Sequence, residues 1–198
     1  MARPRRRDYR GAIHHVATNG NNHQVMFADA DDRRLCIALL GQTAIKYEWD
    51  VFAYTQMDTH WHAVIRTPHA NLSAGMQRLN TAYSRMFNAR HGRTGHSIRN
   101  RFMSVLVERD DHYRELTRYL PLNPVREGLA SHPEDWPWTS YRVEIGTDAE
   151  PIWLNASWSL RAHGTIHRLR SWVAKGMAEP DAQWAPGSDP TLTRRPAG

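Results

Sequence analysis

Two histidines, His60 and His62, stand on either side of Trp61. The surrounding residues indicate extended strands before and after the triplet, joined by a turn at Asp58-Thr59. Because successive strand side chains point to opposite faces, the two imidazoles are expected side by side, with Trp61 turned into the core. Two neutral imidazoles on a rigid sheet make half of a metal site, although histidines in strands are more often solvated or hydrogen-bonded.

A second group of candidates is Tyr119 and Asn123. They are four residues apart and therefore share one face of a predicted helix. An amide oxygen would complete the coordination of a metal that polarises a phosphate, and a phenolate would attack the phosphorus in line. Taken singly, Tyr119 is better explained as a core aromatic and Asn123 as a helix stop before proline. Together with the histidine pair, they predict metal-assisted phosphoryl transfer.

Two other tyrosines compete for the role of nucleophile. Tyr113 lies six residues before Tyr119, roughly opposite in helical phase, so it is expected to pack. Tyr83 lies on the apolar stripe of another predicted helix and is interpreted as a core residue. Pro121, between Tyr119 and Asn123, removes a helix N–H and is expected to kink the last turn.

The elements that must position these residues follow the order β-α-β-β-α-β-α. Strands are predicted over 12–18, 51–57, 60–65 and 102–108. Helices are predicted over 29–47, with Asp29 or Asp31 as the cap, from Asn71 or Ser73 to about 90, and from a cap at Asp110 or Asp111 to about Leu122. This order predicts an α+β fold, a ferredoxin-like or RRM-like antiparallel sheet with helices on one face and the other open for a site. His15, on the first strand with Ile13 and Ala17, is only a weak candidate for supporting the metal ligands.

The chain is long enough for one well-packed domain and an appendage. The sequence divides into a basic N-terminal arm at 1–11, the domain that carries the chemistry at 12–145, a Trp-rich C-terminal extension at 146–185 and a disordered tail at 186–198. A short helix over about 160–177 is expected in the extension.

The net charge is +6, with a pI near 9.9, and Lys46 and Lys175 are the only lysines. An arginine-rich surface suits a polyanionic partner, although a genome biased towards arginine codons would have the same composition. Cys36 is alone, which excludes an intramolecular disulfide and a Cys-based zinc site. The sequence shows neither a signal peptide nor a membrane-spanning run, so a cytoplasmic, nucleoid-associated protein is expected.

The chain also resembles a known family over about residues 12–145. The resemblance is carried by His15-Val16, Gly20-Asn21-Asn22, Phe27, Met57-x-x-His60-x-His62, Thr67-Pro68, Leu72-Ser73, Met76-Gln77, Arg101-Phe102-x-Ser104, Val107-Glu108, Asp110, Tyr113, Tyr119, Asn123-Pro-Val-Arg-x-Gly-Leu129, Pro133 and Trp136-Pro-Trp138-x-Ser140-Tyr141. This pattern resembles the single-tyrosine HUH (IS200-like) transposases and, within them, the REP-associated tyrosine transposases. A match of that length is specific, whereas His-x-His alone is weak.

The resemblance implies metal-dependent nicking and rejoining of single-stranded DNA at hairpin or palindromic repeats, through a 5′-phosphotyrosine intermediate. It implies Tyr119 as the nucleophile and His60, His62 and Asn123 as ligands of Mg²⁺ or Mn²⁺. It also implies a monomer rather than a homodimer. The chain departs from the family pattern at Asn19, His23, 98–100 and Pro121.

DNA contacts are predicted at arginines in the arm and loops, which grip phosphates. These arginines are Arg5, Arg6, Arg7, Arg10, Arg99, Arg101 and Arg126.

Two other functions stay open. In the first, Pro121 spoils the site and the protein is a catalytically impaired DNA-hairpin-binding module. In the second, His60 and His62 belong to a zinc hydrolase, for which no convincing third His or carboxylate ligand stands at motif spacing.

Overall fold

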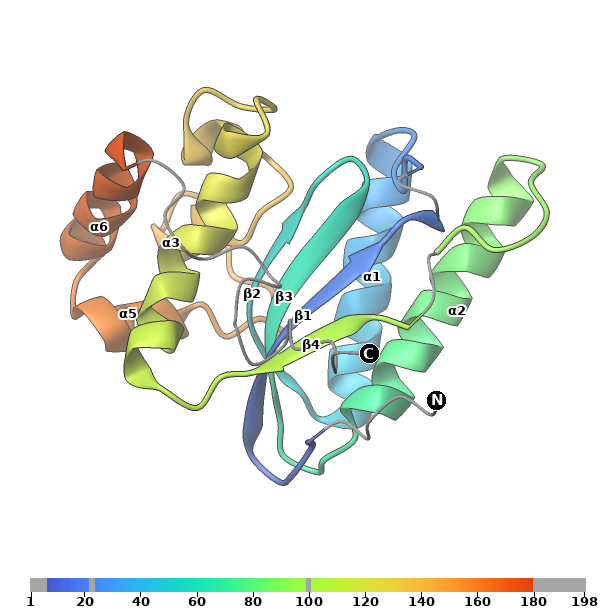
Figure 1. The fold of residues 1–198 in the computed structure, drawn as a ribbon, viewed down its shortest axis with the longest axis horizontal. Coiled ribbons are helices and arrows are strands. Elements are labelled where there is room, and N and C mark those ends of the chain that lie inside the picture. Colours follow the sequence, from blue (N-terminus) through green and yellow to red (C-terminus); the bar gives the residue numbers. More distant parts are fainter. Residues whose placement is uncertain (1–6, 22–23, 99–100, 180–198) are drawn as a thin grey trace, which may run out of the picture.

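The computed structural model of the chain describes residues 7–21, 24–98 and 101–179. In these residues, four strands form one antiparallel sheet in the order β2-β3-β1-β4 (Figure 1). The strands are β1 (Ala12–Asn19), β2 (Asp50–Gln56), β3 (His60–Thr67) and β4 (Met103–Leu106).

Helices lie on both sides of this sheet (Figure 1). On one face are α1 (Ala30–Tyr47) and α2 (Leu72–Arg90). On the other are α3 (Asp110–Arg126), α5 (Ser157–His163) and α6 (Ile166–Ala178). The 3-10 turn η2 (Pro133–Asp135) and the short helix α4 (Tyr141–Glu144) belong to the segment that connects α3 to α5 and runs beside the edge strand β2. The β-α-β-β-α-β order confirms the predicted α+β, ferredoxin-like fold, and the face that was expected to be open carries α3.

The apolar core is divided by the sheet. The larger cluster joins the sheet to α1 and α2, and includes Trp61, Leu40 and Met76. The smaller cluster joins the sheet to α3 and α5, through Val64, Leu120 and other residues. Alternation along β3 accounts for the division, because neighbouring side chains enter different clusters.

The start of α1 follows the prediction. Asp29 is its N-cap, and the Asp29 carboxylate accepts hydrogen bonds from the backbone N–H groups of Asp31 and Asp32. Such a cap satisfies amide donors that have no partner inside the helix. The helix then buries an apolar face that contains Leu39 and Leu40.

The predicted end of α3 is wrong. The helix continues past Leu122 to Arg126, with both Pro121 and Pro124 inside it. A proline removes the N–H that its own residue would donate, and its ring crowds the carbonyl four residues back, but tertiary packing that outweighs this cost lets the helical turn persist. Here Leu122 is buried with residues of α6, and Asn123 is buried too. The predicted cap is also wrong, because the N-cap is Arg109, without a side-chain cap.

Two further boundaries differ from the prediction. Strand β4 spans only Met103–Leu106, since it pairs with a four-residue stretch of β1. The single helix expected near the C-terminus is two helices, α5 and α6, separated at Gly164. Gly164 has a φ of 80°, a left-handed conformation that glycine adopts without a Cβ clash, so the chain turns there.

The Trp-rich segments are integral to the packing. Trp136 donates its indole N–H to the Gln56 carbonyl, and the backbone N–H of Ser140 donates to Tyr54, so this segment borders β2. Trp158 is fully buried, stacked on Phe52 at a centroid distance of 6.1 Å. The tail predicted at 186–198 and residues 1–6 of the arm lie outside the described residues.

Candidate functional site

The histidine pair lies on β3, on the sheet face that carries α3. The rings of His60 and His62 are 4.9 Å apart between centroids and perpendicular, while Trp61 is buried in the cluster on the other face. The Nδ1 of His60 is 3.2 Å from Thr59 Oγ1. The predicted side-by-side arrangement of the imidazoles is therefore present.

Helix α3 brings the predicted tyrosine to this pair. The Tyr119 ring stands edge-on to His62, with a centroid distance of 5.7 Å, and is only 7% exposed. One turn later, the amide nitrogen of Asn123 donates to the Tyr119 carbonyl over 2.7 Å. Because a carbonyl can only accept, this bond fixes the orientation of the amide and leaves its oxygen for another partner.

His15 joins the site more closely than the sequence suggested. Its Nε2 is 3.2 Å from Nδ1 of His62, and its ring is 5.5 Å from the Tyr119 ring. In the β1–β3 register Ala17 faces His62, so His15 is a diagonal neighbour on the same face. The position of His15 on the first strand indicated which face of the sheet its side chain occupies. Which residue of the neighbouring strand it meets depends on the pairing register, which the sequence pattern does not give.

Burial keeps these imidazoles neutral. It lowers the pKa of His15 to about 3, with a smaller contribution from His112, and it holds the pKa of His62 well below its usual range. Charged imidazoles would lose hydration in this buried position. Neutral imidazoles are the form that binds metals, so the electrostatics agree with a role as ligands.

One nitrogen of His62 favours such a role. Within 7–21, 24–98 and 101–179, no group hydrogen-bonds to the buried Nε2 of His62. A buried polar atom without a partner costs free energy, and a metal ion would satisfy it. If Nδ1 of His62 donates to His15, the lone pair of the His62 ring is at Nε2, where a ligand needs it.

The third ligand would be of another chemical kind. In the described part of the chain, no three His, Cys, Asp or Glu side chains form a group that could hold a metal ion. This weighs against the zinc hydrolase alternative, which needs such a set. An amide oxygen, as Asn123 offers, suits a hard ion such as Mg²⁺ or Mn²⁺. The residues present therefore fit the predicted ion.

Glu127 was missed by the sequence analysis. Its Oε1 lies 3.6 Å from Nε2 of His60, and its pKa is raised by burial and then by the charge of Asp58. Glu127 follows Asn123 by four residues, the same spacing that connects Tyr119 to Asn123. The prediction that the helix stops near Leu122 concealed this relation.

The turn before His60 is held from outside the sheet. Arg33 of α1 forms an ion pair with Asp58 and donates to the Met57 carbonyl over 3.2 Å. Its guanidinium lies 5.1 Å from the Trp136 ring centroid. A buried guanidinium that spans the turn restricts its motion, which favours a fixed His60 position.

Comparison with known proteins identifies the family. A family model described as "Transposase IS200 like" matches residues 8–121, more than half of the chain. The protein belongs to the IS200-like transposase family. The match includes His60, His62 and Tyr119 of this IS200-like transposase and ends before Asn123. No curated protein matches the sequence significantly.

A solved structure described as a REP-associated tyrosine transposase bound to a REP hairpin resembles this transposase over 77% of the present chain and 90% of its own. The TM-score is 0.65 and the identity 17%, a likeness of fold. A tRNA(His) guanylyltransferase from Saccharomyces cerevisiae also aligns, with 8% identity, a TM-score of 0.46, and coverage of 89% of this chain and 82% of that one.

The competing tyrosines of this IS200-like transposase have other contacts. The Tyr113 hydroxyl donates to the Trp158 carbonyl over 3.0 Å, and burial raises its pKa to about 12. The Tyr83 hydroxyl donates to the carbonyl of Met26 inside the core, where burial raises its pKa far above the usual range. Both hydroxyls are thus engaged by backbone carbonyls, whereas the Tyr119 ring contacts His62, so Tyr119 is the better candidate.

The predicted DNA-binding arginines of the transposase are not gathered at one place. Arg101 precedes β4 and Arg126 ends α3, both towards the His60 end of the sheet. Arg7 and Arg10 lie near the opposite end, where Gly11 donates to Thr67, and Arg7 pairs with Glu108. Three other arginines lie outside the described residues: Arg5, Arg6 and Arg99.

None of the helices described for this transposase is long and apolar enough to span a bilayer.

Proposed function

We propose that the protein nicks and rejoins single-stranded DNA at hairpin or palindromic repeats, with Tyr119 as the nucleophile. The observation that carries this proposal is the edge-on contact of Tyr119 with His62 on the histidine face of the sheet. Membership in the IS200-like transposase family supports the same chemistry. His60, His62 and Asn123 would hold Mg²⁺ or Mn²⁺, which when bound polarises the scissile phosphate.

The reaction proceeds by exchange of one phosphoester for another. The Tyr119 oxygen loses its proton and bonds to phosphorus, and the bond from phosphorus to the 3′ oxygen breaks. The 3′ oxygen takes up a proton and leaves as a hydroxyl, while the 5′ phosphate stays on the tyrosine. Attack by a 3′-hydroxyl reverses these steps and releases Tyr119, so the joining step needs no nucleotide cofactor.

The surrounding residues prepare Tyr119 for this step. Its ring packs against both His15 and His62, and its carbonyl accepts from Asn123, so the phenol loses little freedom when DNA binds. The continuity of α3 past Pro121 supports an active enzyme over a binding module. We also propose that the protein acts as a monomer in the cytoplasm, associated with the nucleoid.

The test is the formation of a covalent adduct. The protein is incubated with Mg²⁺ and single-stranded DNA that carries a hairpin, then separated under denaturing conditions. We expect an adduct that is absent in Tyr119→Phe, with nicking reduced by at least about 10³-fold, the scale on which loss of a nucleophile acts. Tyr113→Phe, on the same helix, is the matched control and keeps the adduct.

Two results would contradict the proposal. An adduct that persists in Tyr119→Phe would place the link elsewhere. Tight hairpin binding by the wild-type protein, with no adduct in Mg²⁺ or Mn²⁺, would favour the binding module.

A further inference from the structure

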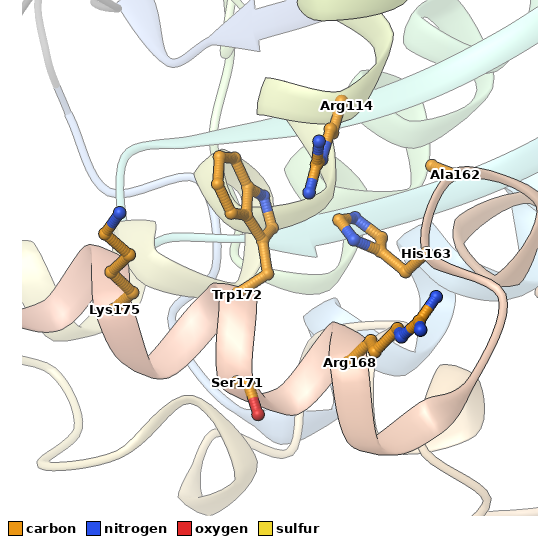
Figure 2. A pocket seen from close by; sticks show the side chains of 7 residues that line it. All are labelled: Arg114, Ala162, His163, Arg168, Ser171, Trp172 and Lys175. Carbon is orange, nitrogen blue, oxygen red and sulfur yellow. The ribbon is translucent and has the colours of Figure 1, made fainter.

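A second concave region lies between α3, α5 and α6, on the side of α3 away from the sheet. It encloses about 540 Å³, and Figure 2 shows Arg114, His163 and Trp172 converging there from the three helices. The lining is completed by Ala162, Arg168, Ser171 and Lys175. None of these residues belongs to the histidine and tyrosine site.

The charged side chains that line this pocket are all positive. Arg114, Arg168 and Lys175 line it, and its lining contains no carboxylate. In the described part of the chain, Arg114 and Arg168 form no ion pair, and Lys175 is 3.8 Å from Glu179. Three cations in one concavity repel each other, and an anion would relieve this repulsion.

Most of the other described arginines are neutralised by acids. Such pairs are Arg34 with Asp31, Arg66 with Asp50, Arg90 with Asp29, and Arg142 with Asp148. Even Arg118, which borders Trp172 at 4.2 Å from the ring centroid, pairs with Glu115 and Glu179. Arg114 and Arg168 have no acid partner among the described residues, and they are distinguished from other arginines of that kind by lining one concavity together with Lys175.

The pocket is built by close packing. Gly176 lets α6 approach α3, because a Cβ there would lie 2.6 Å from Leu122 Cδ1. The Arg114 guanidinium lies 4.6 Å from the Trp172 ring centroid, a cation–π contact that orients it. His163 is held to Thr117 over 2.8 Å. Donors fixed in this way lose little entropy when they bind a ligand.

We propose that this pocket binds a phosphodiester group in the single-stranded flank of the DNA substrate. A guanidinium can donate two parallel hydrogen bonds to two oxygens of one phosphate, and the pocket offers two guanidinium groups, those of Arg114 and Arg168. Arg114 precedes Tyr119 by five residues, about 8 Å along the helix axis. Five residues also turn the helix by about 140°, so a strand leaving the nicking site would reach the pocket by passing around α3. This inference rests on the proposed function and assigns a site to the flank.

The test compares DNA with and without flanks. Binding of the full-length protein to a labelled hairpin is measured by fluorescence anisotropy, with the bare hairpin and with ten-nucleotide flanks on both sides. We expect Arg168→Glu to weaken binding of the flanked hairpin by about three- to tenfold. The slope of log affinity against log salt should fall by about 0.7, as for one lost phosphate contact on a single strand. Binding of the bare hairpin should not change.

The matched control is Arg34→Glu, the same charge reversal on the exposed face of α1, which should change neither affinity. Equal losses for bare and flanked DNA, or a loss as large in Arg34→Glu, would overturn the proposal. It would also fail if inorganic phosphate shifted Trp172 fluorescence (assigned with Trp172→Phe) while the flanks changed no affinity. That result would indicate a small-anion site.

The two proposals fail separately. If the wild-type protein forms no covalent adduct but Arg168→Glu still loses the flank-dependent affinity, the nicking proposal fails and the pocket stands. If the adduct forms on saturating DNA in both proteins and the flank has no effect on affinity, the pocket fails and nicking stands.

Discussion

The two faces of the sheet differ although the same strands build them. Trp61 and His62 are adjacent on β3 and both nearly fully buried, yet Trp61 packs in an apolar cluster with α1 and α2 while His62 faces His15, His60 and Tyr119. Both faces bury a nitrogen without a hydrogen-bond partner among the described residues, Nε1 of Trp61 on the first and Nε2 of His62 on the second, which costs stability. On the first face apolar packing surrounds that nitrogen, whereas on the second the neighbouring rings are two further imidazoles and a phenol. This difference indicates that the α3 face is maintained for chemistry, and the apolar face holds it rigid.

The largest expected effect is a difference in stability between substitutions of the neighbouring residues Trp61 and His62. Trp61→Ala leaves a large cavity, so we expect the free energy of unfolding to fall by about 3–5 kcal/mol, measured by urea denaturation. His62→Ala should cost only about 1–2 kcal/mol, because it also removes a buried nitrogen without a partner. It should nevertheless abolish Mn²⁺ binding, measured by calorimetry. Equal destabilisation by both changes would mean that the histidine face is an ordinary core.

The second prediction concerns the pH dependence of the free energy of unfolding, which a buried carboxyl on the α3 side of the sheet should produce. Glu144 is buried near α5, where Ser140 donates to it over 2.8 Å, and burial raises its pKa from 4.5 to about 7. The folded protein therefore binds this proton more tightly than the unfolded chain. The stabilisation is complete below pH 4.5 and is lost as pH rises through 7.

The pKa shift of Glu144 corresponds to about 3 kcal/mol of folding stability. Glu144→Gln should remove this slope between pH 5 and 8 and raise stability at the alkaline end, measured by urea denaturation at each pH. The exposed Glu108→Gln is the control and should keep the slope. A Glu144→Gln variant with the wild-type profile would show that this carboxyl does not titrate in that range.

The smallest effect concerns the orientation of His62. His15→Phe removes the hydrogen bond to Nδ1 of His62 and should weaken Mn²⁺ binding about tenfold, the scale for groups that orient a metal ligand. His15→Gln can still accept from that nitrogen and should restore part of the affinity. His14→Phe changes the preceding buried histidine, which contacts Ser104 and Asp8, and should leave metal affinity unchanged. Equal losses in the His14 and His15 variants would point to damage of the strand rather than to orientation.

Short-range patterns predicted much of the fold. The strand and helix order, the Asp29 cap and the opposite orientations of His62 and Trp61 all follow from spacings of two to four residues, which backbone geometry dictates. The predicted boundaries were wrong where contacts with segments distant in the sequence determine the length of an element. Burial of Leu122 with residues of α6 accompanies the extension of α3 past two prolines, and that packing is invisible in the local sequence.

The candidate site divides in the same way. The sequence alone determined that His60 and His62 share a strand face and that Tyr119 and Asn123 share a helix face, because each pair belongs to one regular element. Only the tertiary structure decided that these faces meet, that His15 stands behind His62, and that Glu127 reaches His60. Strand register and helix length depend on contacts between residues tens of positions apart, which a local pattern does not encode.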